Sequence, residues 1–323
     1  METTELYPPF TVGVDLGGTN TAFAIVDSVG HIVANDSIPT RTPTVEKWAD
    51  NLASKISRMI ADNILEGMIE GIGIGAPCAN ASTGCIEGAT NLPWPSPIAL
   101  VNMMESRTGL RTVISNDANA AAIGEMTYGA AAGLRNFIVL TLGTSVGGGI
   151  VCDGHLLSGR SGFAGELGHV TFPFASDRLC SCGRYGCLHT IGSADGIRKT
   201  ARRMLAESDE PSVLRDIPQG EMTPKKVQIA ACDGDRLANR IYEFTGHCLG
   251  KAAAEFAAVT DPEAFILFGG VSKAGDLLLK PMREAFLESA LFLYKDRVRF
   301  LLSKLHDADA AILGAASLPL SMS

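Results

Sequence analysis

The sequence has no surplus of basic residues, no long apolar run and no recognisable leader. Its 27 lysines and arginines are outnumbered by 35 aspartates and glutamates, so the net charge is −8 at pH 7 and no basic face is expected for nucleic-acid phosphates. No window of 18 apolar residues occurs, and the long uncharged stretch at 136–152 is broken by glycine, threonine and serine, which excludes a membrane span. The first residues, METTELYPPF, contain two glutamates and no basic segment, unlike a secretory signal. These absences predict a cytoplasmic protein that binds neither nucleic acid nor membranes.

The composition is that of a folded chain with more than one domain. Hydrophobic residues make up 46% and charged residues only 19% of 323 residues, enough for a substantial core and for two domains of about 150 residues each. Glycine is frequent, with 35 residues or about 11% against a usual level of about 7%. The eight cysteines do not indicate disulfides, because the chain is neither small nor visibly secreted.

Strand-like and helix-like segments alternate along the chain. Runs of β-branched and apolar residues bounded by glycine predict strands at 11–14, 21–27, 31–38, 69–74, 112–115, 137–142, 146–152, 264–268 and 298–302. Apolar residues at helical spacing predict helices at 46–64, 98–108, from 118 onward, and at 194–207, 224–231, 235–259, 274–288 and 308–316. Residues 75–97 are rich in proline and small residues and indicate a loop. This order predicts an α/β fold with parallel sheet, whose ligands bind at the carboxyl ends of strands.

Two strand–glycine turn–strand segments suggest an internal duplication. The first spans 11–27 around Gly17-Gly18-Thr19-Asn20, and the second spans 137–152 around Gly143-Thr144-Ser145. A shift of 126 positions aligns Asp15-Leu-Gly-Gly with Thr141-Leu-Gly-Thr, and each copy then reaches a Gly-His pair. Two such hairpins opening two α/β halves favour a duplicated architecture.

The glycine hairpins are candidates for phosphate binding. No Walker-type G-x-x-x-x-G-K-[ST] segment occurs, and Gly71-Ile-Gly-Ile-Gly-Ala76 fits the loose dinucleotide pattern but precedes turn-rich residues instead of a helix. Glycines let backbone N–H groups approach a phosphate closely, and Thr19 and Thr144 add hydroxyl donors. Asp15, at the end of the first strand, is suited to hold Mg²⁺ directly or through water. The alternative is a pair of ordinary β-hairpin turns.

A separate cluster has the composition of a zinc site. His169, Cys180, Cys182 and Cys187 supply one imidazole and three thiolates, a closed tetrahedral set whose soft ligands select Zn²⁺. Gly183 and Gly186 allow the bends that bring the thiolates together. Four protein ligands leave no open position, so the metal is expected to be structural. The alternative is a loop with free thiols.

The candidate acid–base residue follows a predicted strand. Asn116-Asp117-x-Asn119 lies where a strand ends and a helix begins, so the carboxylate can accept a proton from a substrate hydroxyl while the amides orient its neighbours. Alternatively, Asp117 caps a helix beginning at Ala118. Glu166-Leu-Gly-His169 places a second carboxylate beside the expected zinc ligand, so the metal would organise a loop that carries polar groups.

Together these segments resemble the ROK family of sugar kinases, within the actin-like ATPase superfamily. Glu-x-Gly-His followed by Cys-x-Cys-Gly-x-x-Gly-Cys is the most specific part, and the match runs in order along nearly the whole chain. Its segments are Asp15-Leu-Gly-Gly-Thr-Asn20, Gly71-Ile-Gly-Ile-Gly-Ala-Pro77, Asn91-Leu-Pro-Trp94, Asn116-Asp-Ala-Asn119, Leu142-Gly-Thr-Ser-Val-Gly-Gly148, Glu166-Leu-Gly-His169, Cys180 to Cys187 and Phe268-Gly-Gly-Val-Ser272. The resemblance implies two duplicated, ribonuclease H-like α/β domains with a cleft between them. We expect a small domain at 1–118, a larger one with the zinc loop at 119–305, and a C-terminal helix at about 306–323 that completes the first.

The resemblance also implies a role for each motif. Asp117 is the general base that takes the proton from the sugar's 6-hydroxyl as it attacks the γ-phosphate of ATP. Sugar hydroxyls are expected to contact Asn91, Asn116, Asp117, Glu166, His169 and His189. ATP, with Mg²⁺, is expected at Asp15, Gly17, Gly18, Thr19, Asn20, Thr144, Gly148, Gly269 and Gly270. Structural Zn²⁺ is expected at His169, Cys180, Cys182 and Cys187, and the protein is expected to form a homodimer or homotetramer.

One position departs from the family pattern. His189 stands two residues after the last zinc cysteine, where the family usually has a glutamate that hydrogen-bonds the sugar near C1 and C2. Imidazole offers one donor and one acceptor instead of two acceptor oxygens, so sugar preference is expected to differ, or activity to be weakened or lost. An alternative makes His189 a zinc ligand, although the proximity of Cys187 favours His169. A smaller departure is Ala76-Pro77-Cys78, where Pro-Gly-Pro is common.

Three functions follow from the resemblance. The leading one is an ATP-dependent hexokinase with glucose as the default substrate, with mannose, allose, N-acetylmannosamine and N-acetylglucosamine left open and polyphosphate as an alternative donor. A second is a catalytically weak sugar sensor, because of His189. The third is a repressor; those of the family carry a helix-turn-helix before the first hairpin, whereas only ten residues precede Thr11 in this acidic sequence. We therefore expect an enzyme.

Overall fold

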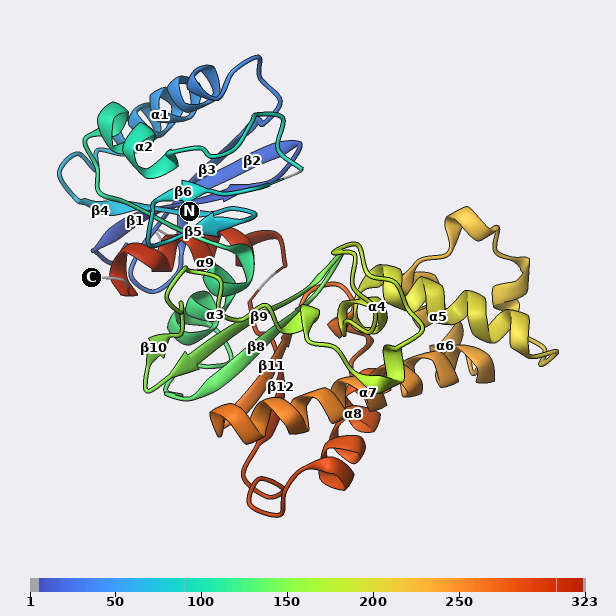
Figure 1. Cartoon of the computed structure of the whole chain (residues 1–323). Coiled ribbons are helices and arrows are strands. Elements are labelled where there is room, and N and C mark those ends of the chain that lie inside the picture. Colours follow the sequence, from blue (N-terminus) through green and yellow to red (C-terminus); the bar gives the residue numbers. More distant parts are fainter. Residues whose placement is uncertain (1–5, 90, 306, 322–323) are drawn as a thin grey trace. The chain divides into compact units, whose positions relative to one another are not determined.

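The computed structural model describes residues 6–89, 91–305 and 307–321, which form two compact units (Figure 1). Within this part, the first unit comprises the chain up to Gly133, Leu156–Ala164 and the residues from Lys304, and the second comprises Leu134–His155 and Gly165–Ser303. Position 118/119, where the sequence analysis places the end of the first domain, lies in the first turn of α3 (Asp117–Tyr128). The first unit continues past it because α3 packs on α9 (Asp307–Ser321). No helix among the described residues is long and apolar enough to cross a membrane.

The two units contain sheets of the same topology. The first sheet has the order β3-β2-β1-β4-β7, in which β1 pairs antiparallel with β2 and parallel with β4. The second has the order β10-β9-β8-β11-β12, in which β8 pairs antiparallel with β9 and parallel with β11. The strands are β1 (Phe10–Leu16), β2 (Asn20–Val26), β3 (Ile32–Pro39), β4 (Ile69–Gly75), β7 (Thr112–Ser115), β8 (Phe137–Leu142), β9 (Val146–Cys152), β10 (His155–Leu156), β11 (Ala264–Phe268) and β12 (Arg299–Leu302). This repeat confirms the duplicated α/β architecture predicted from the two glycine hairpins.

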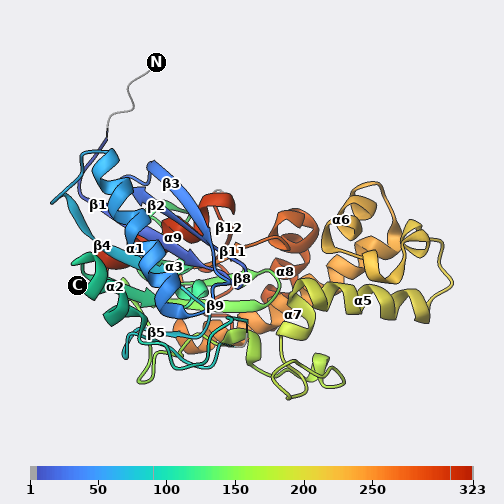
Figure 2. The same ribbon diagram turned by 90° about the horizontal axis from the view of Figure 1, so that it is seen from above.

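In the first unit, helices cover both faces of the sheet. α1 (Val45–Asp62) and α2 (Leu100–Thr108) lie on one face, and α3 and α9 lie on the other (Figures 1 and 2). Residues four apart on α1, Trp48, Leu52 and Ile56, are buried in the core on their side of the sheet. This is the face that the helical spacing of apolar residues predicts.

In the second unit, most helices come after the loop that contains Cys180, Cys182 and Cys187. They are α4 (His189–Gly192), α5 (Ala194–Glu207), α6 (Pro224–Cys232), α7 (Arg236–Thr260) and α8 (Asp276–Ser289). The long helix α7 packs on α8, α6 and α5, and Figure 2 shows α5 and α7 side by side. Close approach to α8 requires glycine at 250, where a Cβ would lie 2.2 Å from the carbonyl oxygen of Met282. The core of this unit therefore lies between the sheet and α7.

Glycines on β1 and β4 serve helix packing. A Cβ on Gly13 would lie 2.2 Å from the carbonyl oxygen of Ile312, and one on Gly73 would lie 1.8 Å from that of Ala315. α9 therefore rests directly on the strand backbones, a contact that any side chain would prevent. Ala315 is four residues before Pro319, whose missing N–H leaves this carbonyl without its usual helical donor. Close packing thus requires glycine at 73, and also at 71, where a Cβ would lie 2.8 Å from the carbonyl oxygen of Arg111.

Several boundaries differ from the sequence prediction. The stretch 75–97, expected to be loop, contains a small antiparallel pair, β5 (Ala79–Asn80) and β6 (Cys85–Ile86). α9 continues to Ser321 through Pro319 instead of ending at 316, and Arg111 Nη1 donates a hydrogen bond to the carbonyl of Pro319 at 3.0 Å. Short 3₁₀ helices were not predicted: η1 (Leu167–His169), η2 (Pro173–Ala175), η3 (Val213–Asp216), η4 (Gln219–Glu221) and η5 (Ser272–Ala274).

The end of α1 contains a strained residue that predicts a stabilising substitution. Ile64 follows the C-cap Asn63 with φ of 56° and a residue exposure of 83%. A left-handed conformation costs a residue with a Cβ about 1–2 kcal/mol, and this side chain buries little. Ile64→Gly is therefore expected to raise the free energy of unfolding by about 1 kcal/mol after the entropy cost of glycine. Denaturant titration measures the free energy of unfolding of wild type, Ile64→Gly and the control Ile64→Ala, which keeps the Cβ. The prediction is contradicted if the glycine variant is no more stable than the alanine variant.

Candidate active site and metal centre

In the first unit, polar residues gather where the parallel strands end. β1, β4 and β7 run in the same direction, so Asp15 of β1 and the Asn116-Asp117 pair after β7 lie at one edge of the sheet. The pKa of Asp15 is raised, first by burial and then by the negative charge of Asp117. Two carboxylates that repel each other beside a glycine hairpin form a site that a cation would stabilise.

The start of α3 separates the capping role from the candidate base. Asn116 is the N-cap, and its Oδ1 accepts a hydrogen bond from Asn119 N at 2.7 Å. Asp117 is the first helical residue, and its Oδ1 accepts from Ala118 N at 2.9 Å. Loss of hydration raises the pKa of Asp117, while the N–H of Ala118 opposes the rise. The residue that caps this helix, which the sequence left open, is therefore Asn116, and the carboxylate of Asp117 interacts with the N–H of Ala118 and with its own N–H.

A buried threonine that the sequence did not single out fixes the first hairpin. Thr40 donates through Oγ1 to the carbonyl of Gly17 at 2.7 Å, and its N–H donates to the carbonyl of Thr19 at 2.9 Å. Thr19 itself is exposed. On the other side, a Cβ on Gly18 would lie 2.7 Å from the carbonyl oxygen of Asn91. The hairpin and the Asn91 loop, expected to bind phosphates and sugar respectively, therefore touch through their backbones.

In the second unit, the equivalent hairpin lies against the segment after β11. Gly143 N donates to the carbonyl of Ser145 at 3.0 Å, which leaves Thr144 and Ser145 exposed at the turn. Val271 N donates to the carbonyl of Leu142 at 3.0 Å. Gly269 has φ of 98°, and a Cβ there would lie 2.8 Å from the same carbonyl oxygen. The two segments expected to hold ATP in this unit are thus adjacent.

The Glu166 loop is seated on β9 by two glycines. Gly148 lies inside β9 opposite Leu140, and a Cβ there would lie 2.6 Å from the carbonyl oxygen of Gly165. A Cβ on Gly168 would lie 2.0 Å from the carbonyl oxygen of Val146. Gly148, expected to bind ATP, thus lies away from the turn and makes room for the loop that carries Glu166.

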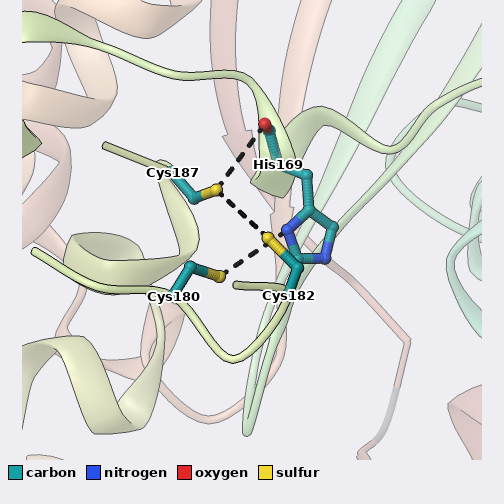
Figure 3. Close-up of side chains that lie close together, drawn as sticks. All are labelled: His169, Cys180, Cys182 and Cys187. Carbon is teal, nitrogen blue, oxygen red and sulfur yellow. Dashed lines mark hydrogen bonds between the residues drawn. The ribbon is translucent and has the colours of Figure 1, made fainter. Parts of the chain in front are cut away.

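The four expected zinc ligands converge (Figure 3). Cys180 Sγ lies 3.7 Å from His169 Nδ1, and Cys182 Sγ lies 3.6 Å from Cys187 Sγ. All four ligand atoms lie within 4.8 Å of one another. A tetrahedron with zinc–sulfur bonds of about 2.3 Å has edges of about 3.8 Å, so the donor set and its spacing fit Zn²⁺.

The thiol pKa values describe a cluster that favours a cation. The N–H of Arg184 is the main cause that lowers the pKa of Cys182 to about 6, whereas burial and the neighbouring thiols raise that of Cys187 to about 12. Crowded thiols resist losing further protons when no cation is bound. A divalent metal would remove this repulsion and could bind all three as thiolates.

His189 lies between the metal cluster and the second hairpin. Its Nδ1 accepts a hydrogen bond from Val146 N at 3.3 Å, which assigns the remaining proton of the neutral ring to Nε2. The ring stacks on that of His169, with centroids 5.9 Å apart and planes at 16°. Burial, followed by His169, lowers the pKa of His189. The imidazole therefore offers a ligand a donor at Nε2.

Each unit brings together its own share of the expected residues. Those of the first unit are Asp15, Gly17, Gly18, Thr19, Asn20, Asn91, Asn116 and Asp117. Those of the second are Thr144, Gly148, Glu166, His169, Cys180, Cys182, Cys187, His189, Gly269 and Gly270. Thr40 and Val146, which fix the hairpins, were missed because an isolated threonine or valine near a strand end carries no local signal.

The repeated sheets and helices define a two-domain actin-like ATPase fold. The sequence pattern of the ROK family matches residues 11–321, and the chain belongs to this family. It is 38% identical over 307 residues to a glucokinase from Halalkalibacterium halodurans, covering 94% of this chain and 92% of that protein. An N-acetylmannosamine kinase from Citrobacter koseri is 32% identical over 316 residues, covering 95% and 98%. A ROK family glucokinase from Streptomyces griseus, solved with glucose and AMPPNP, superposes with a TM-score of 0.75 at 33% identity, covering 96% of this chain and 98% of that one.

Proposed function

We propose that this member of the ROK family, an ATP-dependent sugar kinase, transfers the γ-phosphoryl group of ATP to the 6-hydroxyl of a hexose, with glucose as the default substrate. The observation that carries this proposal is the grouping of Asp117, Asp15 and the first glycine hairpin at one sheet edge. It supplies a base, a candidate carboxylate for Mg²⁺ and backbone N–H groups for phosphate within one unit. The similarity to glucokinases supports glucose.

Asp117 acts as the general base. One carboxylate oxygen accepts the N–H of Ala118, and the other takes the proton as the sugar O6 forms a bond to the γ-phosphorus and the bond from that phosphorus to ADP breaks. The raised pKa of Asp117 makes it a stronger base than an ordinary aspartate. When bound with ATP, Mg²⁺ neutralises charge on the phosphates, and Asp15 is the residue placed to hold it. The hairpin N–H groups orient the phosphates.

The metal centre organises the sugar-binding loops. His169, Cys180, Cys182 and Cys187 would hold Zn²⁺ with four protein ligands, which would leave no position for substrate. The site is therefore structural, and it fixes the segment that carries Glu166. We assign sugar hydroxyl contacts to Glu166 and His169 in this unit, and to Asn91 and Asn116 in the first.

A specific observation favours a second substrate class, the N-acetylhexosamines. Because Val146 N–H engages Nδ1 of His189, a ligand meets a donor at Nε2 where a glutamate would offer only acceptors. A donor at Nε2 suits the carbonyl oxygen of an acetamido group, because this oxygen can only accept hydrogen bonds. The similarity to an N-acetylmannosamine kinase is consistent with this alternative.

An ADP-release assay across hexoses and N-acetylhexosamines tests the proposal. We expect turnover that depends on both ATP and sugar, with the highest kcat/KM for glucose. A maximum at N-acetylmannosamine or N-acetylglucosamine selects the second class. The kinase proposal is contradicted if the protein is folded, contains zinc and binds sugars but releases no ADP with any sugar of the panel. That result would favour a sugar sensor.

His189→Glu is expected to lower KM for glucose by about threefold to tenfold at saturating ATP. The reason is that a carboxylate strengthens hydrogen bonds to hydroxyl donors by about 1 kcal/mol, and the same change is expected to weaken acceptance of N-acetylhexosamines. Steady-state kinetics on both sugar classes measure it. His155→Glu, an exposed histidine of β10, is the matched control; equal KM values in wild type and His189→Glu make the position incidental to sugar binding.

A further inference from the structure

We propose that His189 is also a positioning residue, which holds the second glycine hairpin, and through it the ATP phosphates, against the metal centre. The inference rests on the proposed function, because that function assigns the hairpin to phosphate binding. It concerns Nδ1 of His189, the atom that faces the protein, and is independent of which sugar Nε2 meets.

The hairpin is held at its first strand residue, Val146. This residue follows Thr144 and Ser145 directly, so its backbone sets where the turn lies. Its N–H donates to His189 Nδ1 at 3.3 Å. Its carbonyl oxygen faces Gly168, where a Cβ would lie only 2.0 Å away. Both sides of the Val146 backbone are therefore fixed by segments next to metal ligands, Gly168 beside His169 and His189 two residues after Cys187.

The contacts continue from His189 in both directions. Toward the metal, its ring stacks on His169, whose Nδ1 faces Cys180 Sγ at 3.7 Å. Toward the hairpin, the short helix α4 leads from His189 to Ala194, whose N–H donates to the carbonyl of Gly143 at 2.8 Å. The segment after Cys187, from His189 to Ala194, is thus hydrogen-bonded to the hairpin at Gly143 and at Val146.

The bond geometry distinguishes substitutions that keep this contact from those that lose it. Nδ1 is attached to Cγ of His189, which is also where asparagine carries Oδ1. His189→Asn therefore retains an acceptor for the N–H of Val146. Glutamine carries its oxygen one bond further, near the position of Nε2, so His189→Gln leaves the N–H of Val146 without its acceptor.

The test measures AMPPNP binding by calorimetry and amide hydrogen exchange of the peptide spanning 142–150, in zinc-loaded wild type, His189→Asn and His189→Gln. We expect His189→Gln to weaken AMPPNP binding by about twofold to tenfold, the effect of one lost hydrogen bond, and to speed exchange in the hairpin. His189→Asn is expected to match wild type in both. In turnover at saturating sugar, KM for ATP is expected to be higher in His189→Gln than in His189→Asn.

The outcomes separate this inference from the proposed function. Hairpin exchange is measured without nucleotide, so it reports positioning even if wild type fails to bind AMPPNP, a failure that would count against the proposed function alone. Faster exchange in His189→Gln than in His189→Asn supports the inference. Equal exchange in all three proteins, or equal acceleration in both variants, overturns it.

Discussion

Replacing Asp117 by asparagine is expected to lower kcat by roughly 10²–10⁴-fold, the range for loss of a general base, with little change in KM for ATP. The fold should survive, because the N-cap of α3 is Asn116 and the new side chain keeps an oxygen for the N–H of Ala118. Steady-state kinetics with glucose measure the effect. Asp276→Asn is the matched control, an exposed aspartate at the first position of α8; near-normal turnover in Asp117→Asn removes this residue from the role of base.

The pH dependence gives this variant a second readout. Since the pKa of Asp117 is raised above the ordinary value of 3.8, the base is lost on acidification earlier than an ordinary aspartate would be. Wild-type kcat should fall as pH drops through the raised pKa, and the residual activity of Asp117→Asn should lack this pH-dependent fall.

The raised pKa of Asp117 also means that the ionised carboxylate destabilises the fold. Asp117→Asn should therefore be at least as stable as wild type at neutral pH, with the difference fading on acidification.

Replacing Cys182 by serine is expected to release the metal and lower the melting temperature by roughly 10 °C. Cys182 is exposed, so little core packing is lost and the effect reports the metal. Structural zinc contributes about 10–16 kcal/mol in zinc-finger peptides; a third of that, about 3–5 kcal/mol, corresponds to a shift of this size. Metal analysis and thermal unfolding measure it together.

Cys232→Ser provides the matched control, because Cys232 is also exposed and lies outside the cluster. It should keep both the metal and the wild-type melting temperature. Protein purified without chelators that contains no zinc, or a Cys182→Ser variant with unchanged metal content and stability, contradicts a structural zinc site.

Elements with a strong local pattern were predictable from the sequence. The strands 112–115, 137–142, 146–152 and 264–268 and the helix 194–207 have the predicted bounds. The convergence of His169 with the three cysteines was predictable for a similar reason, since these cysteines lie within eight residues and are spaced by glycine. The duplicated α/β architecture was predictable from the repeated hairpins, whereas the order of strands in each sheet was not predicted.

Features that depend on through-space neighbours were not predictable. The requirement for glycine at 73 and 168 comes from the carbonyls of Ala315 and Val146, which lie far away in the sequence. α9 extends past residue 316 while its backbone packs directly on β1 and β4. We infer that this packing offsets the helical hydrogen bond lost at Pro319. The contact between His189 and Val146 joins residues 43 apart, and no local pattern indicates it.

The most direct test of the account is the identity of the product formed from glucose and ATP, by phosphorus–proton correlation NMR, with wild type and Asp117→Asn in parallel. The account predicts that wild type forms ADP and a hexose phosphate whose phosphorus couples to the protons on C6, while Asp117→Asn forms almost none in the same time. Phosphate on another hydroxyl, no sugar phosphate, or equal product from both proteins would contradict it.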